Sequence, residues 1–358
     1  MANSSIELVW SILLCLILLV SSGMLGVISY RGFKNRNLYS GFSSLACALL
    51  IIFFAITEIL YGLFPWPYGP HFLIISVIIV SFQFVFAILR KKKLDKNPDK
   101  IKKPDYINKD SISFQDELKR KAFHLAGILV PVGFYWVFPL ISNLIYKIIT
   151  LPGGQAFYEF FWGDIAFYPY VLNDPVAPGD LIYFTLWCGL MFMFAFDFIR
   201  IFINPEYSIF HRLLKSVLRK REYISVGPQV LLVLGAVFSF FCARVGWFSY
   251  EIAVSATFTA CIADGLVAVF GKRFGKHKVN IFNGGEKSIE GFIFGFVSAY
   301  LCSMIIIGPV YAVFAAIIFV LIDIFTLPIA DNLLNPILLS LGVWGISLLL
   351  NFPVGWGF

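Results

Sequence analysis

Long apolar runs separated by short polar segments dominate this sequence. A helix needs about 20 apolar residues to cross the hydrocarbon core of a bilayer, and most of the runs have about this length. The pattern therefore predicts an all-α, polytopic integral membrane protein with about ten transmembrane helices. The predicted spans lie near residues 8–29, 41–64, 71–89, from 121 past 139, 181–203, 226–247, 250–269, two successive runs between 290 and 328, and 333–350.

Composition supports this class. Hydrophobic residues make up 59% of the 358 residues and charged residues only 14%, far from the average of soluble proteins. The net charge of +7 does not indicate a nucleic-acid partner, because the basic residues lie in short loops between apolar runs. The six cysteines lie in apolar runs without a C-x-x-C pair, so we expect neither a disulfide framework nor a zinc site. No obligate protein partner is indicated.

Charge divides the chain into three parts. Residues 1–89 form a predicted three-span unit, residues 90–120 a charged linker, and residues 121–358 a membrane domain of about seven spans. Basic residues recur in every second loop. By the positive-inside rule these loops lie in the cytoplasm, and both termini lie outside. The protein is expected in the cell membrane or in an endoplasmic-reticulum-type membrane.

One stretch, residues 263–291, combines an acid, glycines and cations. Asp264 stands alone in an apolar run, Gly271 and Gly275 follow on the same helical face, and a basic loop comes next. An intramembrane acid is costly and is a functional candidate by default. An acid followed by bare backbone and cations suits a phosphate ester with its divalent metal. The alternative is a helix-packing acid before an ordinary cytoplasmic loop.

Polar residues of five segments are predicted at one membrane depth. Asp264 lies seven residues before Gly271, about 10 Å inside the cytoplasmic end of its span. A transport pathway would place polar residues through the midplane instead, so a site that faces the cytoplasm is favoured. Individually, some of these residues could neutralise each other, pack, or cap a helix. The other members are Glu117, Lys121, His124, Asp197, Arg200, Glu222, Asp323, Asp331 and Asn332.

Four blocks resemble the CTP-dependent lipid kinase family, which includes dolichol kinase, phytol kinase and the CTP-using diacylglycerol kinases. The similarity covers roughly residues 117–339 and leaves the first three spans outside. Ala263, Asp323 and Leu334 stand where the family often has Gly, Glu and Thr. The blocks, in family order, are ELKRKAFHLAG, DFIR with LRKREYISVGPQVLLVLG, ADGLVAVFGKRFGKHK with EKSIEG, and ADNLLNPIL.

The resemblance implies transfer of the γ-phosphate of CTP to a membrane lipid alcohol, with Mg²⁺ or Mn²⁺, at the cytoplasmic face. Asp264 would hold the metal, with Asp323 or Asp331 as a second acid. The proton acceptor for the lipid hydroxyl stays open between His124 and an acid. Phosphate contacts would come from Gly271, Gly275, Lys276, Lys278, Lys287 and Ser288, with Lys121 and Arg200 as secondary candidates; Glu117, Asp197, Glu222, Glu290 and Asn332 complete the expected site.

Two alternatives remain. The nucleotide block also resembles CDP-diacylglycerol synthases, which are cytidylyltransferases, although their C-terminal His-Gly-Gly and Asp-Arg signature is absent from this sequence. The third hypothesis is a non-enzymatic membrane transporter or scaffold. The lipid acceptor stays open as well. A dolichol-like polyprenol is preferred over a diacylglycerol, an archaeol-type diradylglycerol or a phytol-type alcohol.

Overall fold

The computed structural model confirms an all-α, polytopic membrane protein. It describes residues 4–96, 115, 118, 121–209, 222, 225–280, 286–325 and 327–356. Within these ranges, eight helical segments are long and apolar enough to cross a membrane. The α-helices outside the irregular segment described below are α1 (Ser4–Lys34), α2 (Leu38–Tyr61), α3 (Tyr68–Asp95), α7 (Pro152–Trp162), α8 (Ala177–Phe198), α10 (Pro228–Arg244), α11 (Tyr250–Phe274), α12 (Ile289–Ile324) and α13 (Asp331–Leu350). Three short helical turns are η5 (Ile165–Phe167), η6 (Ile199–Ile203), which continues α8, and η7 (Pro205–Tyr207).

Helix α12 folds back on itself at Gly308. A straight helix of its 36 residues would be about 54 Å long. Yet Lys287 Nζ, just before its start, lies 2.7 Å from the carbonyl oxygen of Asp323, next to its end. Gly308 makes the reversal with φ 77°, and Pro309 follows it. Counting both legs and the shorter apolar helix α10, the described residues contain the ten predicted apolar segments.

The segment from Phe123 to Thr150 is an interrupted helix. Pro131 and Pro139 each remove a backbone donor, which explains why regular α-helix gives way to tighter and wider turns. Gly127 lies so close to α11 that a Cβ there would overlap Cys261. The segment is therefore pressed against α11. Its parts are η3 (Phe123–Ile128), α5 (Leu129–Val132), η4 (Gly133–Val137) and α6 (Phe138–Thr150).

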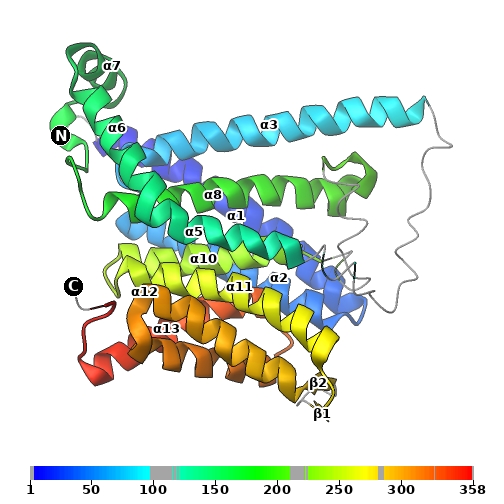
Figure 1. The fold of residues 1–358 in the computed structure, drawn as a ribbon. Helices are drawn as coiled ribbons and strands as arrows, with labels where there is room; N and C mark the ends of the chain where they lie inside the picture. Colours follow the sequence, from blue (N-terminus) through cyan, green and yellow to red (C-terminus); the bar gives the residue numbers. More distant parts are fainter. Residues whose placement is uncertain are drawn as a thin grey trace.

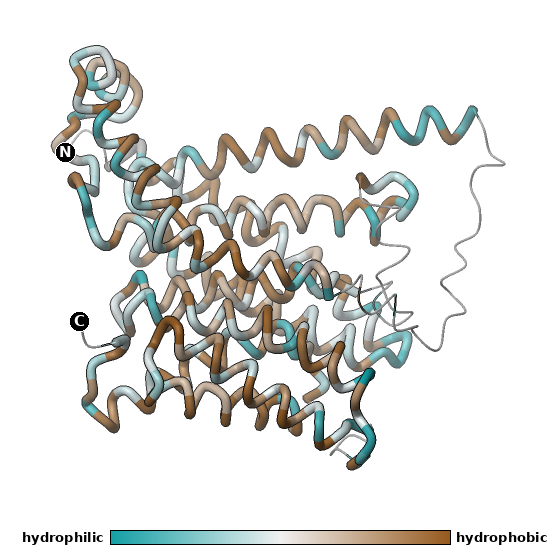
Figure 2. The backbone as a smooth tube through the Cα atoms, viewed as in Figure 1, coloured by the Kyte–Doolittle hydropathy of each residue, from teal (hydrophilic) through white to brown (hydrophobic). Residues whose placement is uncertain are grey.

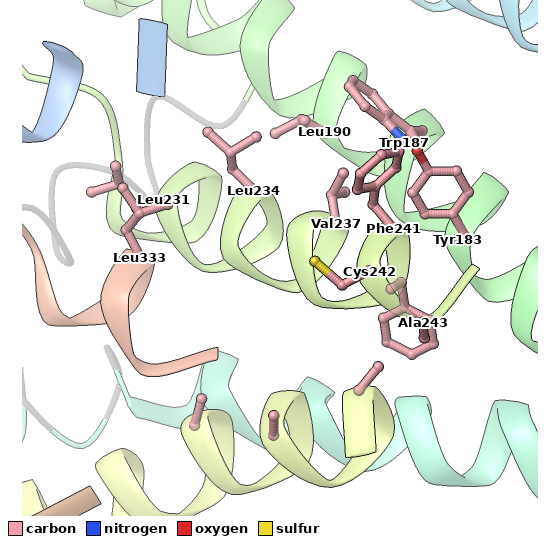
Figure 3. Close-up of a cluster of buried hydrophobic side chains, with 14 of the residues drawn as sticks. Tyr183, Trp187, Leu190, Leu231, Leu234, Val237, Phe241, Cys242, Ala243 and Leu333 are labelled. Atoms are coloured by element: carbon pink, nitrogen blue, oxygen red, sulfur yellow. The ribbon is translucent and has the colours of Figure 1, made fainter. Parts of the chain in front are cut away.

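A single core joins the N-terminal helices to the rest. Figure 3 shows side chains of α8, α10 and α13 meeting, with Trp187 near Phe241 and Leu231 near Leu333. On α2, the Phe54 ring packs edge-on against Trp187 with ring centroids 5.1 Å apart. Such pairs add to the stabilisation from apolar burial. The first three helices thus share the core of the later spans, while the division into units stays a prediction.

The two ends of the bundle differ in the elements that they carry. Both termini lie at one end, together with α7, and the short hairpin of β1 (Lys278–Asn280) and β2 (Glu286–Ser288) lies at the other (Figure 1). The strands are antiparallel, with Lys278 opposite Ser288. Hydrophilic residues collect at this hairpin end, and the helices between the ends are mainly hydrophobic (Figure 2). Which end faces the cytoplasm stays a prediction.

Candidate functional site

A cavity of about 610 Å³ lies at the hairpin end of the bundle. Its walls come from the segment before η3, α11, the β-hairpin, both ends of α12 and the beginnings of α2, α10 and α13. The structure thus brings most of the predicted site residues together, although they are scattered over 212 positions of sequence from Lys121 to Asn332. Those that line the cavity are Lys121, Glu222, Asp264, Gly271, Gly275, Lys278, Lys287, Ser288, Asp323, Asp331 and Asn332.

Asp264 lies in the cavity wall on α11 and is paired with Lys121. The Lys121 ammonium donates to Asp264 Oδ2, and His124 Nδ1 lies 3.4 Å from the same oxygen. His124 Nδ1 is also 3.2 Å from the Cys261 carbonyl oxygen, one turn before Asp264. The close packing at Gly127 explains this arrangement, because it brings η3 against α11. His124 is buried behind Asp264 rather than in the cavity wall.

A second lysine–aspartate pair lies on the same cavity. Lys287 on β2 donates to both the side chain and the backbone carbonyl of Asp323 at the end of α12. The turn at Gly308 makes this pair possible, because it returns the second leg of α12 to the hairpin. Both side chains keep access to the cavity, with 29% and 17% of their surface exposed. These two pairs thus place two carboxylates and two ammonium groups in the cavity wall, which also contains Lys272 and Lys278 and the acids Glu222, Glu286 and Asp331.

Besides α2, three helices begin at the cavity wall. Pro228 is the first residue of α10, Ser288 caps α12 by accepting from the Gly291 amide at 3.1 Å, and Asp331 begins α13. Asn332 Nδ2 donates to the Pro228 carbonyl oxygen at 3.1 Å and ties two of these beginnings together. A helix N-terminus carries partial positive charge and unsatisfied amide donors, so it favours anions. These beginnings offer amide donors to an anion, while the C-terminal ends of α11 and α12, which also line the cavity, contribute partial negative charge.

The glycines allow α11 and α12 to approach closely. A Cβ on Gly275 would overlap the Ser288 side chain, and one on Gly271 would lie 3.6 Å from Gly291 Cα. The space left by Gly275 is thus filled by the cap of α12. The two glycines hold the start of α12 at the cavity as well as exposing backbone to it.

Asp197 and Arg200 form a buried pair outside the cavity wall. Their side chains are 1% and 0% exposed, and Arg200 Nε lies 2.9 Å from Asp197 Oδ1. Arg200 also donates to the carbonyl oxygen of Ser225 at 2.7 Å, while Asp197 Oδ2 accepts from the Gly227 amide at 2.6 Å. These bonds hold the chain just before α10. The role of Arg200 in phosphate binding stays a prediction, and its observed contacts are structural.

Two other predicted residues, Glu290 and Lys276, lie outside the cavity wall. Glu290 accepts from the Lys276 amide at 3.1 Å and from His277 Nδ1 at 2.6 Å, so it fastens the hairpin to α12. Neither Glu290 nor the exposed Lys276 lines the cavity. Glu117 lies outside the described residues.

The cavity wall also contains three side chains that are not among the expected site residues: Tyr39, Lys272 and Glu286. Lys272 and Glu286 belong to the basic stretch and could have been found there. Tyr39 comes from α2, in the unit to which the sequence assigned no chemistry. Near it, Ser43 Oγ accepts from the Ala330 amide at 2.9 Å, which ties α2 to the chain before α13. No sequence pattern pointed to this contact.

Comparison of the chain with models of protein families, with curated proteins and with solved structures finds no match. The resemblance to CTP-dependent lipid kinases therefore stays a prediction, and the function has to be inferred from the site itself. In the part of the chain that the structure describes, no three His, Cys, Asp or Glu side chains are grouped so as to hold a metal ion unaided.

A charge-removing variant tests whether the cavity binds polyphosphate. We expect Lys287→Gln to raise the dissociation constant of a nucleoside triphosphate about tenfold or more, because the substitution removes a cation of the cavity wall that would contact the phosphates. Binding would be measured by calorimetry on purified protein. Arg273→Gln is the matched control, since Arg273 lies on the same stretch but outside the cavity wall. Equal affinities for both variants would place the anion elsewhere.

Proposed function

We propose that this protein transfers the γ-phosphate of CTP to the hydroxyl group of a membrane lipid alcohol. The observation that carries the proposal is the convergence of two lysine–aspartate pairs and three helix N-termini on one cavity at an end of the membrane bundle. Phosphoryl transfer requires mainly positioning and charge neutralisation. The preference for CTP and for a polyprenol acceptor comes from the sequence resemblance.

In each of the two ion pairs, the substrate complex can replace the lysine as partner of the aspartate and the aspartate as partner of the lysine. A metal–triphosphate complex offers cationic charge to Asp264 and Asp323 and anionic charge to Lys121 and Lys287. Binding would exchange each internal pair for two pairs with the substrate, so that no buried charge is left alone. Lys278 adds a further cation; it now lies 2.9 Å from Glu286 across the hairpin.

The carboxylates fit a magnesium ion that arrives with the nucleotide. Mg²⁺ prefers oxygen ligands and usually takes one or two carboxylates, substrate phosphates and waters. A cluster of three protein ligands is therefore not required. Asp264 would hold the ion with Asp323 or Asp331, all of which line the cavity. When bound, the metal supplies neutralisation of the phosphate oxygens.

The other site residues would act by orienting these groups. His124 touches Asp264 from behind, at 3.4 Å, and would fix the orientation of its carboxylate. Asp197 and Arg200 hold the chain that leads into α10, where Glu222 and Pro228 line the cavity. The lipid would enter from the bilayer with its hydroxyl at the interface.

Position-specific labelling of CTP tests the reaction. Purified protein would receive Mg²⁺ and unphosphorylated polyprenol, diacylglycerol or phytol, with CTP labelled at either the α- or the γ-phosphate. We expect γ-label in the lipid, most strongly with polyprenol, and no α-label, as judged by thin-layer separation. Reactions with chelator in place of Mg²⁺ are the control.

Two results would contradict the proposal. Transfer of α-label to a phosphorylated lipid, with release of pyrophosphate, would identify a cytidylyltransferase. Absence of both transfers, together with absence of nucleotide binding, would favour a non-enzymatic protein.

A further inference from the structure

A second cavity, of about 510 Å³, lies between α1, α3 and α8. Its lining differs from the charged lining of the first cavity, because its described residues are apolar apart from Ser21, Ser76 and Ser81. It opens at the lipid-facing surface, since Val20 on α1 and Val77 on α3 line it and are 64% and 58% exposed. Hydrocarbon rather than water or a polar solute suits such a space in a bilayer.

The walls of this cavity are fixed by contacts on either side of it. Gln83 Nε2 on α3 donates to the Phe192 carbonyl oxygen of α8 at 2.8 Å. On the other side α1 is packed against α2, because a Cβ on Gly32 would lie 2.6 Å from the Gly41 amide nitrogen. The helices are thus held by neighbours that do not fill the space between them. The space between them is open to the bilayer side of the helices and can accept a hydrocarbon chain.

A cation lies beside the same cavity, on the side toward the hairpin end of the bundle. Phe202, which lines it, carries the Arg31 guanidinium over its ring at 5.0 Å from the centroid. Arg31 belongs to the last turn of α1 and lies seven residues after Met24, which also lines the cavity, or about 10 Å along the helix axis. An apolar slot with a cation at its interfacial end matches a lipid chain followed by an anionic headgroup.

We propose that this cavity binds one acyl chain of an anionic glycerophospholipid, with the lipid phosphate against Arg31. The charge selects the occupant: a neutral isoprenoid alcohol would fill the slot but leave the cation without an anionic partner. The bound lipid bridges α1 and α8, which supply facing walls of the cavity. This inference goes beyond the proposed function and does not rest on it, because lipid retention is measured without nucleotide or catalysis.

Lipid retention after purification tests the proposal. The full-length protein would be reconstituted in nanodiscs containing equal amounts of phosphatidylglycerol and phosphatidylcholine, extracted with mild detergent and analysed by native mass spectrometry. We expect about one retained phosphatidylglycerol per chain. Arg31→Gln should lower the preference for phosphatidylglycerol over phosphatidylcholine about fivefold, which is the attraction expected of one basic residue at a membrane surface.

A second variant fills the slot. Ser21→Phe places a large ring in the cavity from α1 and should reduce retention of both lipids at least tenfold. Val27→Phe on the same helix is the matched control, because Val27 is 44% exposed and does not line the cavity. Lys147→Gln, on α6 near the end that carries the termini, controls for loss of one positive charge.

Three outcomes would overturn the proposal. The first is equal retention of the two phospholipids by the parent protein, which would indicate an adventitious lipid only. The second is undiminished retention by Ser21→Phe. The third is selective retention of a polyprenol in place of phospholipid when both are supplied, which would make the slot a site for the neutral alcohol.

Discussion

Replacing Asp264 with asparagine should lower kcat for lipid phosphorylation about a thousandfold, which is the upper range for loss of a key electrostatic group in an active site. Asparagine has nearly the same shape, so the fold should be retained. Its neutral amide, however, is a poor ligand for Mg²⁺, and Lys121 loses the carboxylate that it contacts. The measurement is single-turnover transfer of γ-label from CTP to polyprenol at increasing Mg²⁺.

The control for this variant is Asp164→Asn. Asp164 is exposed, lies in the loop after α7 and caps the short turn at Ile165–Phe167, so its replacement should leave kcat unchanged. Thermal unfolding of both variants in detergent would establish that the protein is folded. Full activity of Asp264→Asn at saturating Mg²⁺ would show that the metal assignment is wrong, even if the protein proved to be a lipid kinase.

The second large effect is expected on stability. Arg200→Ala should reduce the free energy of unfolding by about 3–5 kcal/mol, the range for breaking a buried ion pair by removing one partner. Asp197 would be left as an unpaired buried charge, and the carbonyl oxygens of Glu222 and Ser225 would each lose a donor. Chemical denaturation followed by tryptophan fluorescence measures this, since Trp187 is buried on α8, the helix that carries Asp197.

Measurements of stability and of CTP binding on the variant distinguish a structural role of Arg200 from a phosphate-binding role. Arg273→Ala removes the same type of side chain from an exposed position and should change the unfolding free energy by less than about 0.5 kcal/mol. If Arg200→Ala instead matched the parent in stability and only weakened CTP binding, Arg200 would be a phosphate ligand. Its side chain would then have to leave its buried position on substrate binding.

Much of the architecture was predictable because a bilayer constrains sequence strongly. Each span must supply about 20 apolar residues, so the runs could be read directly, and two of them correspond to the separate legs of α12. The two-leg structure depends on Gly308, a glycine in a run that is otherwise helical. Its presence before Pro309 indicated a break, but whether the chain bends or reverses there depends on what the second leg contacts, here Lys287.

Part of the candidate site was predictable for the same reason. A charge inside an apolar run is costly, so Asp264 and Asp323 stood out, and the basic glycine-containing stretch stood out beside them. Arg200 stood out equally well, yet its observed contacts are with Asp197 and backbone carbonyls. An unusual charge in a sequence shows that a partner is needed; it does not show whether that partner is a ligand or the protein itself.

The class of the protein, the approximate spans and the segments of the candidate site can be predicted from the sequence, because they follow from the free energy of placing each residue in hydrocarbon. Which charges meet depends on how the helices pack. Lys121 reaches Asp264 across 143 positions of sequence because Gly127 lets η3 approach α11, and Lys287 reaches Asp323 because α12 turns back at Gly308. These pairings depend on packing between distant segments, and the pattern of any one segment does not contain that information.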